Sequence, residues 1–348
     1  MSGADWKIKV GQASCLSVVE CGGGDRQDAC PTLLHEQASP RALGVVRAWV
    51  FTLWLGDLLR EPIHELAELP LECFQPIGVL RLLPATVWPA VFTPECLWTL
   101  KIGLAVLLLP LILGVGPYRT LAVTACLLLT FWQGLHRGML SVVHRELALL
   151  YVTYTIALFP AADAFSLRRG KKEFASPAMY RAPLVAATLM FCLTYMAVGV
   201  RRLTEGGVEI FLDGTILRYV VLRSAEPGFW SEGAGWLVLE HPWLGWLVQT
   251  AFPVVTAFEV CAPLCLFSRR FRWAWLVVML AFHWGSRSMM QIWFLHNVLL
   301  MPVLLIEIDP LLRRLIPVQS RSDGGTSSAS PFPDGGGLAG ARPSKGDD

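Results

Sequence analysis

Ionisable side chains interrupt several of the most apolar stretches of this sequence. Arg47 and Asp57 share one stretch, Glu259 lies in a second, and His283 and Arg287 lie four residues apart in a third. A charge at the centre of a membrane helix costs about 2.5–3.5 kcal/mol on insertion scales, so each needs a partner or a wet cavity. Two interpretations stay open, namely contacts that fix helix pairing and a polar chamber. The number of such residues favours a chamber that these five side chains line.

The composition predicts the elements that must position these side chains. The chain has 348 residues, of which 54% are hydrophobic and 16% charged, whereas about 25% are charged in soluble domains. The high hydrophobic fraction and the low charged fraction exclude a soluble enzyme and a disordered chain. They predict an all-α bundle of transmembrane helices in a lipid bilayer. The formal net charge of +2 argues against a nucleic-acid-binding protein, which usually has a strongly basic face.

Apolar runs of 17–25 residues are typical of membrane-spanning helices, and about eight are found, within a range of five to eight. The last two could form one broken helix with a re-entrant segment. The eight runs are Ala42–Leu59, Leu97–Val115, Arg119–Leu135, His144–Ala161, Pro183–Val200, Trp243–Phe267, Trp273–Met289 and Met290–Ile306. Polar and interfacial segments join them. We therefore expect a cytosolic tail over 1–40, a transmembrane domain over 41–310 and a disordered Gly/Ser/Pro-rich tail over 311–348.

The distribution of Lys and Arg predicts the orientation in the membrane. With eight crossings, one side carries about twice as many of these residues as the other, and it includes both termini. The positive-inside rule then places both termini in the cytoplasm; the sequence does not distinguish the endoplasmic reticulum from the plasma membrane. Arg201 and Arg202 fall on the lumenal or external face. Cys73 and Cys96 fall there as well, where they could form a disulfide.

Histidine spacing argues against a metal site. The sequence has seven His, but no two of them follow the HxxxH or HxxH spacing that places two ligands on one helix face. We therefore expect no bound metal.

Several short motifs, in this order, resemble the membrane domain shared by vitamin K-dependent gamma-carboxylases and the wider HTTM (horizontally transferred transmembrane) proteins. The resemblance covers residues 41–310. It is carried by ALGVVRAWVFTLWLGD at 42–57, CFQP at 73–76, VVHRELALLYVTYTIALFPAADAFSL at 142–167, AVGVRRL at 197–203 and AFHWGSRSMM at 281–290.

The resemblance implies a quinone or hydroquinone ligand, and it identifies His144 and Arg202 as candidate catalytic residues. In the carboxylases a Lys at the position of Arg202 is thought to deprotonate the hydroquinone. A guanidinium does not accept a proton in this way, although it can stabilise an oxyanion. His144 is then the better proton acceptor. The large lumenal domain of the carboxylases also has no counterpart here, so we do not expect carboxylation.

Three functions follow from these observations. The leading hypothesis is an HTTM-like membrane protein, not a carboxylase, whose lumen-facing polar chamber binds a small amphipathic or quinone-like molecule. The first alternative is a transporter or channel that uses Arg47, Asp57 and Glu259 as a relay. The second is a non-catalytic scaffold, in which the charges in the membrane only specify how the helices pair.

Overall fold

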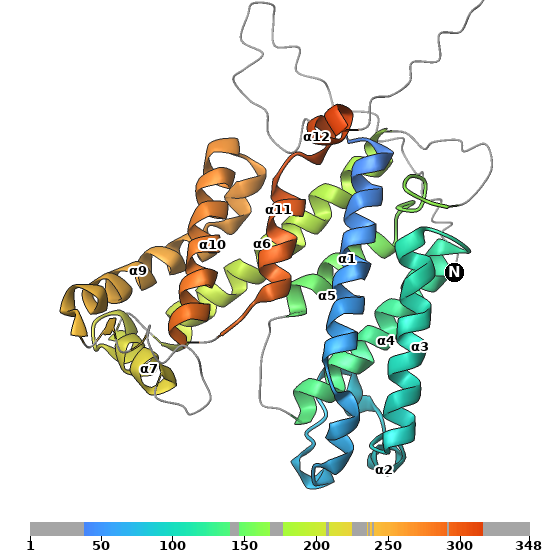
Figure 1. Ribbon diagram of the computed structural model, residues 1–348, viewed down its shortest axis with the longest axis horizontal. Helices are drawn as coiled ribbons and strands as arrows, with labels where there is room; N and C mark the ends of the chain where they lie inside the picture. The colour runs from blue at the N-terminus through green and yellow to red at the C-terminus, as the bar shows by residue number, and fades with distance from the viewer. Residues whose placement is uncertain are drawn as a thin grey trace, which may run out of the picture.

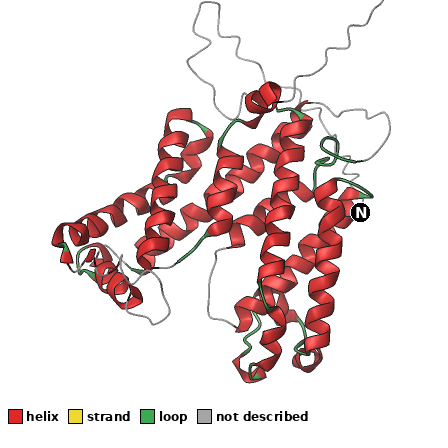
Figure 2. Ribbon diagram, in the orientation of Figure 1, coloured by secondary structure: helices red, strands yellow, loops and turns green. Residues whose placement is uncertain are grey.

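Every regular element in the part of the chain that the structure describes is a helix (Figures 1 and 2). The computed structural model describes residues 38–139, 146–167, 177–206, 209–224, 235, 237–238, 240–290 and 292–315. The larger helices are α1 (Pro40–Arg60), α3 (Pro94–Leu113), α4 (Tyr118–Met139), α5 (Leu147–Ala157), α6 (Pro177–Glu205), α9 (Pro242–Val260), α10 (Arg269–Met290) and α11 (Leu295–Leu305). The all-α prediction is confirmed for these residues.

Smaller helices connect the larger ones. They are α2 (Trp88–Val91), α7 (Thr215–Ser224) and α12 (Ile308–Leu315), together with the 3-10 helices η1 (Ile63–Glu68), η2 (Leu71–Cys73), η3 (Gly78–Leu82), η4 (Ala85–Val87), η6 (Glu209–Phe211) and η7 (Ala262–Leu266). Four of the 3-10 helices and α2 lie between α1 and α3, in one of the polar and interfacial segments predicted to join the spans. Helix α12 extends regular structure to Leu315, past the predicted start of the C-terminal tail.

Three of the described helices are long and apolar enough to cross a membrane: α1, α3 and α6 over Ala178–Glu205. They support a membrane protein, but they do not confirm eight crossings. The predicted spans at 144–161 and 290–306 contain α5 and α11, which have 11 residues each. At 1.5 Å per residue each is about 16 Å long, roughly half the hydrocarbon core of a bilayer.

Helices α1 and α3 pack against each other in opposite directions (Figure 1). Both begin where the sequence has a hydroxyl cap followed by proline, since the side chains of Ser39 and Thr93 accept bonds from backbone N–H groups of the first turn. Helix α3 ends at Gly114, which has a left-handed φ of +68°. Glycine is required at this position for two reasons. A Cβ would strain this backbone conformation, and it would overlap the guanidinium of Arg47.

Each of these two helices carries a buried cation that binds backbone carbonyls at the end of the other. The Nη2 atom of Arg47 donates to the oxygen of Ile112 in the last turn of α3, at 3.3 Å. The Nζ atom of Lys101 in α3 donates to the oxygen of Glu61, directly after α1, at 2.8 Å. The last carbonyls of a helix have no partner within it, and they carry partial negative charge. Cations are therefore favoured at the C-terminal ends of both α1 and α3.

Arg47 also fastens the segment that follows α5. It donates to the carbonyl oxygen of Ala161 through Nη1 at 3.3 Å and to that of Phe165 through Nη2 at 2.6 Å. The side chain is fully buried. The structure therefore places Arg47 among backbone carbonyls of two other segments, an arrangement that matches the helix-pairing interpretation of this residue.

The beginning of α1 lies beside α12, at one end of the bundle (Figure 1). The backbone N–H of Ser39 donates to Oδ2 of Asp309 at 2.8 Å, and the Ser39 hydroxyl contacts the other carboxylate oxygen. The two ends of the described helical region therefore contact each other. The assignment of both termini to the cytoplasm stays a prediction.

Candidate functional site

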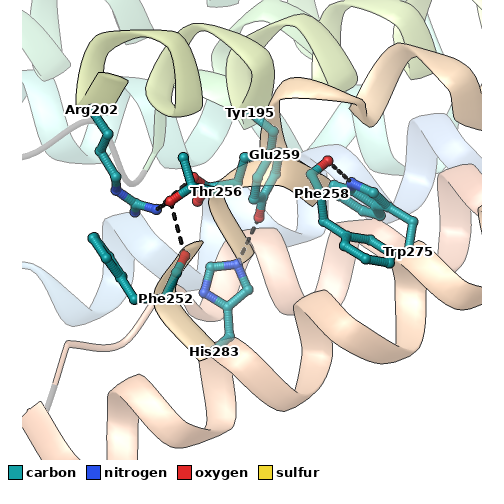
Figure 3. A network of polar contacts seen from close by, with 8 residues as sticks. All are labelled: Tyr195, Arg202, Phe252, Thr256, Phe258, Glu259, Trp275 and His283. Atoms are coloured by element: carbon teal, nitrogen blue, oxygen red, sulfur yellow. Dashed lines mark hydrogen bonds and ion pairs between the residues drawn. The ribbon is translucent and has the colours of Figure 1, made fainter. Parts of the chain in front are cut away.

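Polar side chains from α6, α9 and α10 converge in one cluster (Figure 3). Helix α6 contributes Tyr195 and Arg202, which are two helical turns apart and so lie on one face. Helix α9 contributes Thr256 and Glu259, and α10 contributes His283.

Arg202 and Glu259 form the charged part of this cluster. The Nη1 atom of Arg202 lies 2.5 Å from Oε2 of Glu259 and 3.4 Å from Oγ1 of Thr256. The Glu259 side chain is 2% exposed and that of Arg202 is 23% exposed. The guanidinium carbon also lies 4.8 Å from the ring centre of Phe252. A carboxylate this deeply buried requires a compensating charge, and Arg202 supplies it through a short, charge-assisted hydrogen bond.

Tyr195 and His283 form the neutral part. The Tyr195 hydroxyl lies 2.7 Å from Nε2 of His283, and both side chains are buried. The Trp275 ring packs edge-on against Tyr195 at 5.1 Å between centres, while its Nε1 donates to the Phe258 carbonyl at 2.9 Å (Figure 3). These contacts fix the orientation of the tyrosine. On the other side of the imidazole, Nδ1 has no hydrogen-bond partner among the described residues, and neither has Oδ1 of the buried Asn297 in α11.

Two cavities meet at Arg202. The smaller, about 40 Å³, is lined by Tyr195, Glu259, His283 and Asn297 together with the aromatic rings of Phe282 and Phe294. The larger, about 580 Å³, opens along α5 and α6 and is lined mainly by apolar side chains, among them Leu147, Met190, Leu193 and Ala197. Arg202 lines both cavities, as do Thr194 and Val198. The smaller cavity has room for a few water-sized groups, and the two residues with an unpaired polar atom, His283 and Asn297, are part of its lining.

Comparison of the chain with family models, with curated proteins and with solved structures gives no match. The arrangement of the side chains is therefore the basis for any functional conclusion.

The residues predicted to line one chamber lie in separate places. Arg202, Glu259 and His283 come together, as described. Arg47, in the N-terminal half of α1, binds carbonyl oxygens of α3 and of the segment after α5. Asp57, in the last turns of α1, lies 3.3 Å from His296 in another polar cluster. The guanidinium carbon of Arg287 lies 4.4 Å from the ring centre of Trp293. Arg47, Asp57 and Arg287 thus line neither of the two cavities at Arg202.

Two further predicted sites have different outcomes. His144, the predicted proton acceptor, lies outside the described residues. Cys73 in η2 and Cys96 in the first turn of α3 are both exposed, free thiols, so the suggested disulfide does not form in this structure.

Sequence reasoning missed Tyr195 and Thr256, although signals for both were present. Tyr195 precedes Arg202 by seven residues, and Thr256 precedes Glu259 by three, so each shares a helix face with a charged residue already singled out. A polar residue at such a spacing, inside an apolar helix, marks the face that points into the protein. Asn297 directly follows His296 in the sequence.

The contact between α6 and α9 that positions Arg202 against Glu259 depends on Gly199. A Cβ at this position would lie 3.0 Å from the Glu259 Cβ and from the Val260 nitrogen. Gly199→Ala should therefore force the helices apart and lower the free energy of unfolding by about 1–3 kcal/mol. Thermal unfolding of the purified protein in detergent measures this effect.

Gly103 in α3 provides the matched control. A Cβ there would meet nothing within 4 Å, so Gly103→Ala should be neutral or stabilising by up to about 1 kcal/mol. If both variants unfold at the same temperature, close packing at Gly199 does not hold the site together.

Proposed function

We propose that this chain is a multi-pass membrane protein that binds a small amphipathic, quinone-like molecule. The apolar part of the ligand would occupy the 580 Å³ cavity beside α6, and its polar head group would lie at Arg202. The position of Arg202 in the walls of both cavities is the observation that carries this proposal. A volume of this size falls within the range of about 300–1,000 Å³ that is typical of small-molecule sites, which are mostly apolar with a few polar groups.

The contacts of Arg202 restrict the chemistry of the head group. Within the part of the chain that the structure describes, the guanidinium makes two side-chain hydrogen bonds, to Glu259 and Thr256, and both use Nη1. Arginine has five N–H donors in all. Donors on Nε and Nη2 remain for a ligand. Because Glu259 already balances the positive charge, a neutral carbonyl or hydroxyl suits the site better than a phosphate. This favours a quinone over a charged lipid head group.

Membership of the HTTM family is part of the same proposal. The motifs at 42–57, 142–167, 197–203 and 281–290 support it, and so does a helical bundle with three helices long and apolar enough to cross a membrane. Carboxylation is not proposed, since Arg202 cannot serve as the base that the reaction requires. The predicted orientation, with cytosolic termini, would open the site toward the lumenal or external side.

Mass spectrometry of small molecules that co-purify in mild detergent tests the proposal. We expect an isoprenoid quinone or a similar neutral amphipath. A short-chain ubiquinone can then be titrated into delipidated protein. Ala197→Phe, which places a ring in the larger cavity, should weaken its binding at least about tenfold, equivalent to about 1.4 kcal/mol.

The control is Val200→Phe on the same helix. Val200 is exposed and does not line either cavity, so this variant should bind the quinone as the unmodified protein does. Equal binding by the Ala197 and Val200 variants, or recovery of bulk phospholipid alone, would contradict a ligand site beside α6.

A further inference from the structure

A second polar cluster joins three helices that are distant in the sequence. Asp57 comes from the last turns of α1, Glu146 immediately precedes α5, and His296 lies in the first turn of α11. All three are buried, with exposed fractions of 6%, 5% and 8%. One ligand atom from each lies within 4.8 Å of the other two. The cluster is separate from the Arg202 site, although His296 is the sequence neighbour of Asn297, which lines the smaller cavity.

The spacing of these atoms fits a shared metal ion. Carboxylate oxygen and imidazole nitrogen bind transition metals at about 2.0–2.2 Å, so two such donors on one tetrahedral ion lie roughly 3.3–3.5 Å apart. Oδ1 of Asp57 and Nε2 of His296 are 3.3 Å apart. No two of the three ligand atoms are more than 4.8 Å apart. With the same bond lengths, opposite ligands on an octahedral ion are about 4.2 Å apart, so the largest allowed separation exceeds that value by less than 1 Å.

The helices that carry the donors place them inside the bundle. Helices α5 and α11 have 11 residues each, and they contact each other and α1. Both begin at the cluster, so that Glu146, directly before α5, and His296, in the first turn of α11, meet Asp57 near the end of α1. Interrupted helices of this kind are where membrane proteins commonly build their ion sites.

The surroundings of Glu146 are compatible with this role. Nη2 of Arg137, in the last turn of α4, lies 3.7 Å from Oε2 of Glu146. Carboxylates that bind metals are usually held by a second group, which orients them and tunes their charge. Arg137 therefore occupies the place of an outer partner. Two buried carboxylates and one imidazole still form a donor set with a net negative charge when the histidine is neutral.

We propose that Asp57, Glu146 and His296 bind a divalent transition-metal ion of the Zn²⁺, Mn²⁺ or Fe²⁺ class. Nitrogen and oxygen donors without a thiolate suit these ions. Three protein ligands leave at least one coordination position for water or a substrate oxygen. The absence of paired histidines on one helix led to the expectation of no metal, but here each donor comes from a different helix. The site is independent of the quinone proposed above.

Metal analysis of the full-length protein tests this proposal. Protein purified in mild detergent would be treated with EDTA, dialysed against buffered ZnCl₂ or MnCl₂, and measured by inductively coupled plasma mass spectrometry. We expect close to one tightly bound ion per chain and a higher unfolding temperature in the loaded protein. His296→Gln and Asp57→Asn, which nearly preserve side-chain shape, should each weaken binding at least about tenfold.

Two controls separate this site from adventitious binding. His241→Gln removes an exposed histidine at the start of α9 and should leave the bound metal unchanged. Replacing Cys15, Cys21 and Cys30 with serine removes the thiols of the N-terminal segment and should also change nothing. The proposal is overturned if the unmodified protein retains no Zn²⁺ or Mn²⁺, or if monodisperse His296→Gln protein binds as much as the control. In that case a proton shared between Asp57 and His296 would explain the cluster.

Discussion

Arg47→Met should lower the free energy of unfolding by about 3–5 kcal/mol. The fully buried guanidinium donates to the carbonyl oxygens of Ile112, Ala161 and Phe165. A hydrogen bond from a charged donor contributes about 1.5–3 kcal/mol, and an unsatisfied buried acceptor costs a similar amount. Methionine keeps much of the volume but leaves these three oxygens without this donor. Methionine is also easier to insert into lipid than arginine. This gain is the same in the folded bundle and in separate inserted helices, so it does not offset the loss of the hydrogen bonds.

Thermal unfolding in detergent, followed by loss of the monodisperse peak in size-exclusion chromatography, measures this change. Arg47→Lys should unfold at an intermediate temperature, because one ammonium group cannot reach carbonyls in two separate segments as a planar guanidinium does. Arg60→Met is the matched control, since Arg60 is exposed at the end of the same helix, and it should change little. If Arg47→Met is as stable as Arg60→Met, then Arg47 does not hold α1, α3 and the segment after α5 together.

The positions of the long helices could be predicted from the sequence because the signals are local. Ser39 with Pro40 and Thr93 with Pro94 begin α1 and α3, and Gly114 ends α3. A run of apolar residues fills the length between these signals. Local patterns of this kind need no knowledge of the remaining chain, which is why these boundaries lie within a few residues of the prediction.

Helix continuity was less predictable, because hydropathy counts apolar residues and not hydrogen bonds. The predicted span at 144–161 includes Pro160, which has no N–H to donate to the carbonyl four residues earlier and so weakens a helix at that point. The helix in fact ends at Ala157, and a tight turn follows. The predicted span at 290–306 contains non-helical backbone at 292–294 before α11 begins. No proline or glycine marks that break, so the sequence offered no local reason for it.

Partners of the charged residues could not be predicted, because they come from other helices. Arg47 and Asp57 were correctly expected to need partners elsewhere, but spacing along one helix does not identify them. Ile112 and Phe165 contribute only backbone oxygens to Arg47, which no residue type reveals. Likewise, a search for paired histidines along one helix overlooked Asp57 and His296, which meet only after folding.

Arg202→Met should lower the free energy of unfolding by about 3–5 kcal/mol, because it leaves a buried carboxylate without its partner. Glu259 is 2% exposed, and its Oε2 atom lies 2.5 Å from Nη1 of Arg202. The adjacent Arg201 provides a matched control. It pairs with Glu205 at 2.7 Å, but the two side chains are 73% and 63% exposed, and exposed pairs contribute little to stability. Arg201→Met should therefore unfold close to the temperature of the unmodified protein.

The double variant Arg202→Met with Glu259→Gln separates the structural role of Arg202 from ligand binding. Neutralising Glu259 removes the unpaired charge, so the double variant should recover most of the unfolding temperature lost in Arg202→Met. The change in unfolding free energy of the double variant should then differ from the sum of the changes in the two single variants by more than about 1 kcal/mol, as expected for residues in contact. Binding of short-chain ubiquinone should not recover, because the guanidinium that lines both cavities is still missing. Recovery of both properties would mean that Arg202 serves only to neutralise Glu259, and the ligand site would have to be placed elsewhere.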